Sequence, residues 1–192
     1  GLSKMLAKLL HIKFPNKKPD TANAWKKMVS VIHNSKDEVR IAIVGKYFDT
    51  GDFVLSDAYL SVIEAIKHAA YAQNKKPVIT WVNSGDFEVS KDTKQVDVTK
   101  KLKTLGSYDG IFVPGGFGSR GILGKLEAIR YARENKIPYL GLCYGMQLAV
   151  IEFAQHVSGI NGATSKELDD KALHQVISIM ESQKKTLKGK KY

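Results

Sequence analysis

From Val39 onwards, the chain alternates between compact apolar runs and longer segments in which apolar residues recur every three or four positions. Compact runs rich in β-branched residues are typical of buried parallel strands, and the longer spacing is typical of helices that pack along one side. The predicted strands are 39–44, 77–82, 109–113 and 137–142, and the predicted helices between them are 56–73, 94–105 and 122–135. This alternation predicts an α/β fold with an open, mostly parallel sheet flanked by helices.

The first 36 residues follow a different pattern. Apolar residues between Leu2 and Leu10 can line one face of a short helix, and Ala24–Ile32 predicts a second helix after a break at Asn16–Pro19. This segment is either an arm that packs against the rest of the chain or a connector between two domains. The chain starts with Gly rather than Met, which fits a processed product or a fragment. We therefore predict a separate helical segment at 1–36 and one α/β domain at 37–192.

The run 137–142 leads into Gly-Leu-Cys-Tyr-Gly, residues 141–145, and a helical pattern follows. Its apolar residues recur on one face at Met146, Ala149, Val150 and Phe153. A cysteine on a sharp strand-to-helix turn between two glycines is typical of a nucleophile elbow, and the positive end of the helix favours its thiolate. The pentapeptide alone is equally compatible with a small buried cysteine at the end of a sheet.

A second glycine-rich loop, Pro114–Gly118, directly follows the strand predicted at 109–113. It lacks both the lysine of a phosphate-binding loop and the spacing of a dinucleotide fingerprint. Glycines after a strand let backbone N–H groups point into a site. With an elbow one βα unit later, the loop predicts an oxyanion hole, with one donor from Gly115–Gly116 and the other from the N–H of Tyr144. The alternative is a simple tight turn.

The composition narrows the class of protein. The chain has 192 residues, of which 43% are hydrophobic and 26% charged, as in ordinary globular domains. It has no apolar run long enough to span a membrane and no signal-peptide pattern. Its single cysteine cannot form an internal disulfide, which suits a reducing compartment. We therefore expect a cytoplasmic protein without a membrane partner.

The net charge of +11 is concentrated in the two ends of the chain. Residues 1–36 and 184–192 together carry +12, whereas residues 37–183 carry about −1. The basic ends are therefore interpreted as solvated surface, and we expect no nucleic-acid partner. A Lys-rich patch that binds RNA or an anionic membrane is the alternative, but no interleaved aromatic residues support base stacking.

Three stretches together resemble the glutamine amidotransferase domain of CTP synthases, a class I family with a catalytic triad. They are 44–47 with 57–66, the loop 113–121, and the long segment 129–154. The similarity runs from about residue 39 to 185, and residues 1–36 resemble the connector to a synthetase domain that this chain lacks. The resemblance implies a flavodoxin-like class I amidotransferase fold.

The resemblance also assigns roles to individual residues. Cys143 is the expected nucleophile that attacks the side-chain carbonyl of glutamine. The other expected site residues are Gly115, Gly116 and Tyr144 for the oxyanion hole, Phe117, Gln147 and Glu167 for substrate binding, and Arg120 for GTP. Of these, Glu167 would hold the α-ammonium group of glutamine through a charge-assisted hydrogen bond. A planar, permanently charged donor such as Arg120 suits phosphate or purine contact.

The implied activity extends beyond the chain itself. Hydrolysis of L-glutamine to glutamate would supply ammonia for the ATP- and Mg²⁺-dependent amination of UTP to CTP by the synthetase domain. The glutaminase domain is expected to need no cofactor or metal of its own, and GTP is its expected allosteric activator. The family also implies a homotetramer assembled through the synthetase domain.

One departure from the family pattern concerns the general base. Members of the family use a His oriented by a Glu in a late segment, and none of the five histidines at 11, 33, 68, 156 and 174 matches that position. We therefore expect a C-terminally incomplete domain with little glutaminase activity of its own, since the leaving amine needs a proton. The alternatives are a non-catalytic module that binds glutamine, GTP or a partner, and a different cysteine enzyme with the same elbow.

Overall fold

A parallel sheet forms the centre of the computed structural model, which describes residues 2–13, 20–46, 59–89, 94–116 and 121–180. Its four strands are β1 (Glu38–Gly45), β2 (Lys76–Asn83), β3 (Gly110–Val113) and β4 (Tyr139–Gly141). They lie in the order β2-β1-β3-β4, and all three pairs are parallel. The predicted parallel sheet is therefore confirmed, although β4 is shorter than the apolar run that predicted it.

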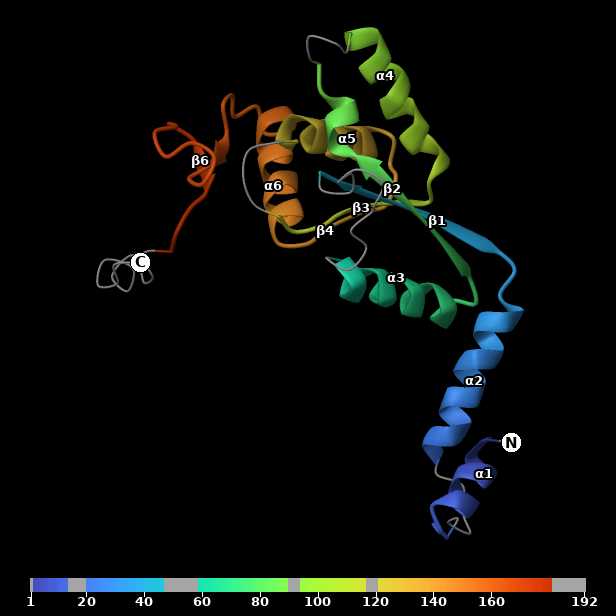
Figure 1. Cartoon of the computed structure of the whole chain (residues 1–192). Coiled ribbons are helices and arrows are strands. Elements are labelled where there is room, and N and C mark those ends of the chain that lie inside the picture. The colour runs from blue at the N-terminus through green and yellow to red at the C-terminus, as the bar shows by residue number, and fades with distance from the viewer. Residues whose placement is uncertain (1, 14–19, 47–58, 90–93, 117–120, 181–192) are drawn as a thin grey trace.

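Helices cover the two faces of the sheet unequally (Figure 1). One face carries α3 (Leu60–Ala72), and the other carries α4 (Gln95–Thr104), α5 (Ile122–Glu134) and α6 (Tyr144–His156). Successive strand residues alternate between these layers, so that Ile43 and Phe112 pack beside α3 whereas Ala42 and Val113 join the larger core. The short helical turns η2 (Ser84–Phe87) and η3 (Leu105–Ser107) flank α4.

A small ribbon follows α6. It pairs β5 (Thr164–Ser165) with β6 (Gln175–Ile177) in parallel and packs beside α6. Val176 and Ile177 of this ribbon contact the larger core.

The two N-terminal helices, α1 (Leu2–Leu9) and α2 (Asp20–Asn34), extend away from the sheet (Figure 1). Trp25 of α2 is 65% exposed, and the apolar side chains of α1 that predicted the helix are exposed as well. Two amphipathic helices are thus confirmed at the predicted places. The domain boundary after residue 36 stays a prediction.

The apolar stripe that predicted α6 is not the face that packs on the sheet. Met146 and Phe153 are 54% and 51% exposed, whereas Leu148 and Ile151 are buried in the core. Because α6 is apolar on more than one side, its periodicity alone could not select the packed face.

Candidate active site

Cys143 lies at the turn between β4 and α6, as the elbow predicts. It is the N-cap residue of α6, and its backbone has φ +50° and ψ −106°. This conformation is costly for a residue with a Cβ, and such strain is concentrated at functional sites. The side chain is exposed and forms no disulfide. The structure therefore presents an accessible thiol at the positive end of a helix.

The two glycines of the elbow are required by close backbone approach. A Cβ on Gly141 would lie 2.6 Å from the carbonyl oxygen of Gly145, and a Cβ on Gly145 would collide with the carbonyl oxygen of Val113. Any side chain at either position would push α6 away from the ends of β3 and β4. The Gly-x-Cys-x-Gly spacing thus reflects packing at the strand ends as well as turn geometry.

Hydrogen bonds fix the elbow from both sides. The amide of Leu142 donates to the carbonyl of Val113 over 3.0 Å, and the amide of Gln147 donates to the carbonyl of Cys143 over 3.1 Å. The phenol of Tyr139 donates to the carbonyl of Gly145 over 2.8 Å, and burial raises the pKa of this phenol. The nucleophile position is therefore held by β3, by β4 and by its own helix.

The glycine loop after β3 lies beside the cysteine. A Cβ built on Gly115 would be 3.5 Å from the Cβ of Cys143. Tyr144 is the first residue of α6, so its N–H is among the amides at the start of the helix that have no partner within it. The structure therefore brings together the expected nucleophile and the two backbone segments expected to carry oxyanion donors.

The side chain of Tyr144 is buried beneath this site. It is 2% exposed, and its hydroxyl has no hydrogen-bond partner among the described residues. Burial, together with the negative charge of Glu167, raises its pKa to about 12. Glu167 itself follows β5 and is exposed.

The other predicted site residues fall into two groups. Gln147 lies four residues after Cys143, which places both on the same side of α6. The side chain of Gln147 is half-buried. Phe117 and Arg120 lie outside the described residues. The roles expected for all of these residues stay predictions.

The histidines do not gather at the elbow. His156 is the last residue of α6, about 20 Å along the helix axis from Cys143, and its Nδ1 lies 3.3 Å from a carboxylate oxygen of Glu152. His68 is exposed on α3, and the backbone of His174 bonds to Thr164 beside the small ribbon. His11 and His33 belong to the N-terminal helical segment. Among the described residues, none of these histidines forms a hydrogen bond or an ion pair with Cys143.

Sequence reasoning missed Lys125. It is in the first turn of α5 and only 2% exposed, and its Nζ lies 5.6 Å from the centroid of the Tyr144 ring. Burial, and to a lesser degree the charge of Lys46, lowers its pKa to about 8. The available signal was its place on α5 between Ile122 and Ile129, both buried, where an apolar residue is expected.

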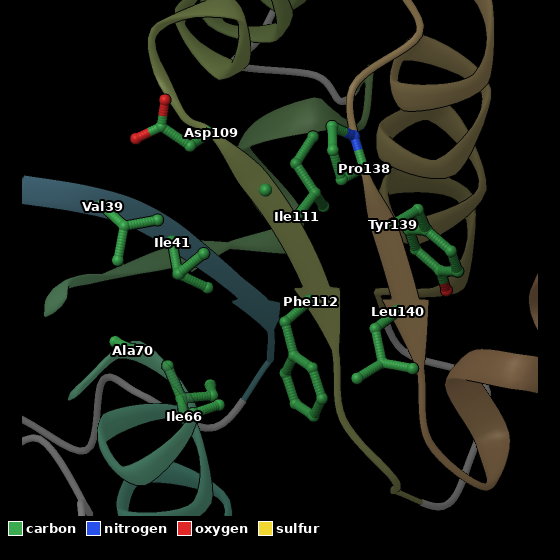
Figure 2. A pocket seen from close by; sticks show the side chains of 12 residues that line it. Val39, Ile41, Ile66, Ala70, Asp109, Ile111, Phe112, Pro138, Tyr139 and Leu140 are labelled. Carbon is green, nitrogen blue, oxygen red and sulfur yellow. The ribbon is translucent and has the colours of Figure 1, made fainter. Parts of the chain in front are cut away.

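An apolar cavity of about 330 Å³ lies elsewhere, beside α3 on the less covered face of the sheet (Figure 2). Ile66, Phe112 and Leu140 border it, and Leu140 is 57% exposed. Its one carboxylate, Asp109, already accepts the backbone N–H of Arg40 over 2.7 Å. None of the described residues that line the cavity is a Cys, Ser, Thr, Lys or His, so the elbow remains the candidate active site.

In the described part of the chain, no group of three or more His, Cys, Asp or Glu side chains could hold a metal ion. No helix there is long and apolar enough to cross a membrane.

Comparison with known proteins agrees with this geometry. The family profile of class I glutamine amidotransferases matches residues 54–191. A CTP synthase of Desulfitobacterium hafniense is 47% identical over 184 residues, which are 96% of this chain and 31% of the relative. A CTP synthase of Methanocaldococcus jannaschii is 44% identical over 184 residues, which are 96% of this chain and 32% of the relative.

A solved structure also matches this chain, and it too is a CTP synthase glutaminase domain. The glutaminase domain of Trypanosoma brucei CTP synthase with bound acivicin superposes with a TM-score of 0.65 at 41% identity, covering 76% of this chain and 51% of that chain. The present chain belongs to the class I glutamine amidotransferase family. Within that family, it corresponds to the glutaminase domain of CTP synthase, and it spans about a third of the length of the curated relatives.

Proposed function

We propose that this chain binds L-glutamine beside the elbow and that Cys143 attacks the side-chain carbonyl carbon. The new carbon–sulfur bond would give a tetrahedral oxyanion, which collapses to a thioester as ammonia leaves with a proton from a general acid. Water would then cleave the thioester to glutamate and the free thiol. The strained, exposed cysteine beside a side-chain-free glycine loop is the observation that carries this proposal.

The remaining residues take the roles that the family resemblance implies. The amides of the Gly115–Gly116 segment and of Tyr144 would stabilise the oxyanion. Gln147 and Phe117 would line the glutamine pocket, and Glu167 would pair with the α-ammonium group of the substrate. Arg120 would contact the activator GTP.

In the longer protein, the ammonia would aminate UTP to CTP in a synthetase domain that uses ATP and Mg²⁺. The curated relatives support this assignment, since each is named a CTP synthase and extends well beyond the matched region. We further propose that the longer protein is a cytoplasmic homotetramer and that residues 1–36 link its two domains. The glutaminase domain would need no metal or cofactor of its own.

We also propose that residues 1–192 alone hydrolyse glutamine only at a background rate. The one histidine on α6 lies at the far end of the helix from Cys143, and the others lie on α3, by the small ribbon and in the N-terminal helices. Without an imidazole at the thiol in the described part of the chain, the leaving amine lacks the proton donor that the reaction needs. This arrangement leaves a second candidate function, which is glutamine or partner binding without turnover.

The experiment combines covalent labelling with turnover. The probe is the chloromethyl ketone analogue of glutamine, which should modify Cys143 in the 192-residue chain and should be slowed by excess glutamine. Cys143→Ala removes the labelling and serves as the control. Glutamate release should stay at the level of this variant. Labelling without protection by glutamine contradicts the proposed site, and robust glutamate release contradicts the proposed lack of a base.

A further inference from the structure

Lys125 is the buried charge that the proposed reaction does not yet use. In the described part of the chain, the buried charged side chains are Lys125 and Glu152, and Glu152 is paired with Arg133. Taking an ammonium group out of water is costly, and its lowered pKa reflects that cost. With a pKa of about 8 the group still remains mostly protonated at neutral pH. A buried cation next to a candidate site is therefore a candidate for a role in that site.

The ammonium group of Lys125 lies close to both segments of the expected oxyanion hole. A Cβ built on Gly116 would be 3.9 Å from Nζ, and the ring centroid of Tyr144 is 5.6 Å from Nζ. The preceding residue, Gly115, lies against Cys143. The nucleophile and the lysine therefore lie against two neighbouring glycines of the same loop.

We propose that Lys125 is a positioning residue of the glutaminase site. Its cation–π contact with Tyr144 and its place against Gly116 hold the two donor segments in one arrangement, and its charge adds positive potential behind the oxyanion hole. This inference rests on the proposed function. Because Lys125 is only 2% exposed, it would act through the two donor segments, and its effect would be on charge that develops in the tetrahedral state.

Stability and reactivity should therefore respond in opposite directions to loss of the charge. Lys125→Met keeps the length and apolar stem of the side chain but removes the desolvated ammonium group. We expect this variant to be at least as resistant to heat and urea as the wild type at pH 7. A lysine that merely supported the fold would give the reverse, a less stable protein.

The experiment compares two reagents on the 192-residue chain. The chloromethyl ketone analogue of glutamine presents a carbonyl that becomes an oxyanion when the thiolate adds to it. The same thiolate attacks the methylene carbon of iodoacetamide and displaces iodide, so no oxyanion forms. The ratio of the two labelling rates cancels the thiolate fraction and so isolates stabilisation of the oxyanion.

In Lys125→Met, we expect this ratio to fall about tenfold, less than the 10²–10³ typical of losing a direct donor. The iodoacetamide rate should stay within about twofold, as expected of a charge that acts on the oxyanion rather than on the thiolate. Lys125→Arg should recover most of the ratio because a guanidinium group can also stack on an aromatic ring. Lys100→Met, at an exposed lysine of α4, is the matched control and should behave as the wild type.

The outcomes separate the two proposals. If glutamine slows chloroketone labelling of the wild type but Lys125→Met keeps the ratio, the inference about Lys125 is wrong and the proposed function stands. If both reagents slow equally in Lys125→Met, the lysine only maintains the elbow, which also overturns the inference. If glutamine gives no protection in the wild type, the proposed function fails and this inference falls with it.

Discussion

The hydroxyl of Tyr139 donates a hydrogen bond of 2.8 Å to the carbonyl oxygen of Gly145, joining the edge strand β4 to the first turn of α6 across the elbow. Tyr139 also packs against the main core, so both its ring and its hydroxyl are used. The carbonyl of Gly145 lies in the crowded region where no side chain fits. The bond therefore couples the strained cysteine turn to the sheet.

Tyr139→Phe should lower the free energy of unfolding by about 1 kcal/mol, because it removes one partly buried hydrogen bond and retains the ring. Urea unfolding monitored by circular dichroism measures this change. Tyr131→Phe is the matched control, since its hydroxyl is 3.5 Å from the Lys103 carbonyl and that contact is exposed. If the two variants lose the same free energy of unfolding, the bond to Gly145 stabilises the fold no more than the exposed contact of Tyr131.

The buried Lys125 should make the free energy of unfolding rise with pH. Its pKa is about 8 in the folded chain, whereas a lysine in the unfolded chain keeps its proton up to about pH 10.4. Between these values unfolding takes up a proton, so stability increases as pH rises. The expected gain from pH 7.5 to pH 9.5 is about 2 kcal/mol. Lys125→Met should lose this gain, and Lys100→Met should keep it.

The measurement must stop below pH 10. Burial raises the pKa of Tyr144 to about 12, above that of a tyrosine in the unfolded chain. Tyr144 therefore stabilises the fold fully below about pH 10, and this stabilisation is lost as the pH rises further. Urea unfolding at half-unit steps between pH 7.5 and 9.5 separates the two effects. A pH dependence that is the same in wild type and Lys125→Met would contradict the burial of the ammonium group.

The sheet and the elbow were predictable from the sequence because their signals are local. Apolar runs predicted each strand of the parallel sheet, and Gly141 and Gly145 marked a turn in which the chain has to pass close to itself. The burial of Lys125 was not predictable in this way. A lysine on an apolar stripe can point its ammonium group into water, but that of Lys125 is instead buried near Gly116 and the ring of Tyr144.

The side of α6 that packs on the sheet could not be predicted from the sequence either. Its position in the structure leads to a prediction about two substitutions on opposite sides of α6. Leu148→Ala should cost about 3 kcal/mol because Leu148 is fully buried, whereas Phe153→Ala should cost less than about 1 kcal/mol because half of that side chain is exposed. Urea unfolding of the two variants under identical conditions provides the comparison. A larger loss for Phe153→Ala would mean that the exposed stripe of α6 is packed in solution.

The buried carboxylate of Glu152 in the middle of α6 provides a last prediction. Arg133 of α5 donates to it from Nε over 3.0 Å and from Nη2 over 2.8 Å, and Glu152 is only 1% exposed. Arg133→Met should cost about 3 kcal/mol because it leaves this carboxylate buried without its guanidinium partner.

The control is Arg130→Met, which breaks the exposed pair with Glu134 one turn away and should cost less than about 0.5 kcal/mol. In the double variant Arg133→Met with Glu152→Met, most of the loss should be recovered, since two apolar side chains of similar volume replace the buried pair. A double-mutant cycle from urea unfolding at pH 7 measures the coupling. Additive losses would show that the pair contributes little, and the docking of α5 on α6 would then depend on apolar contacts such as those of Ile129 and Leu148.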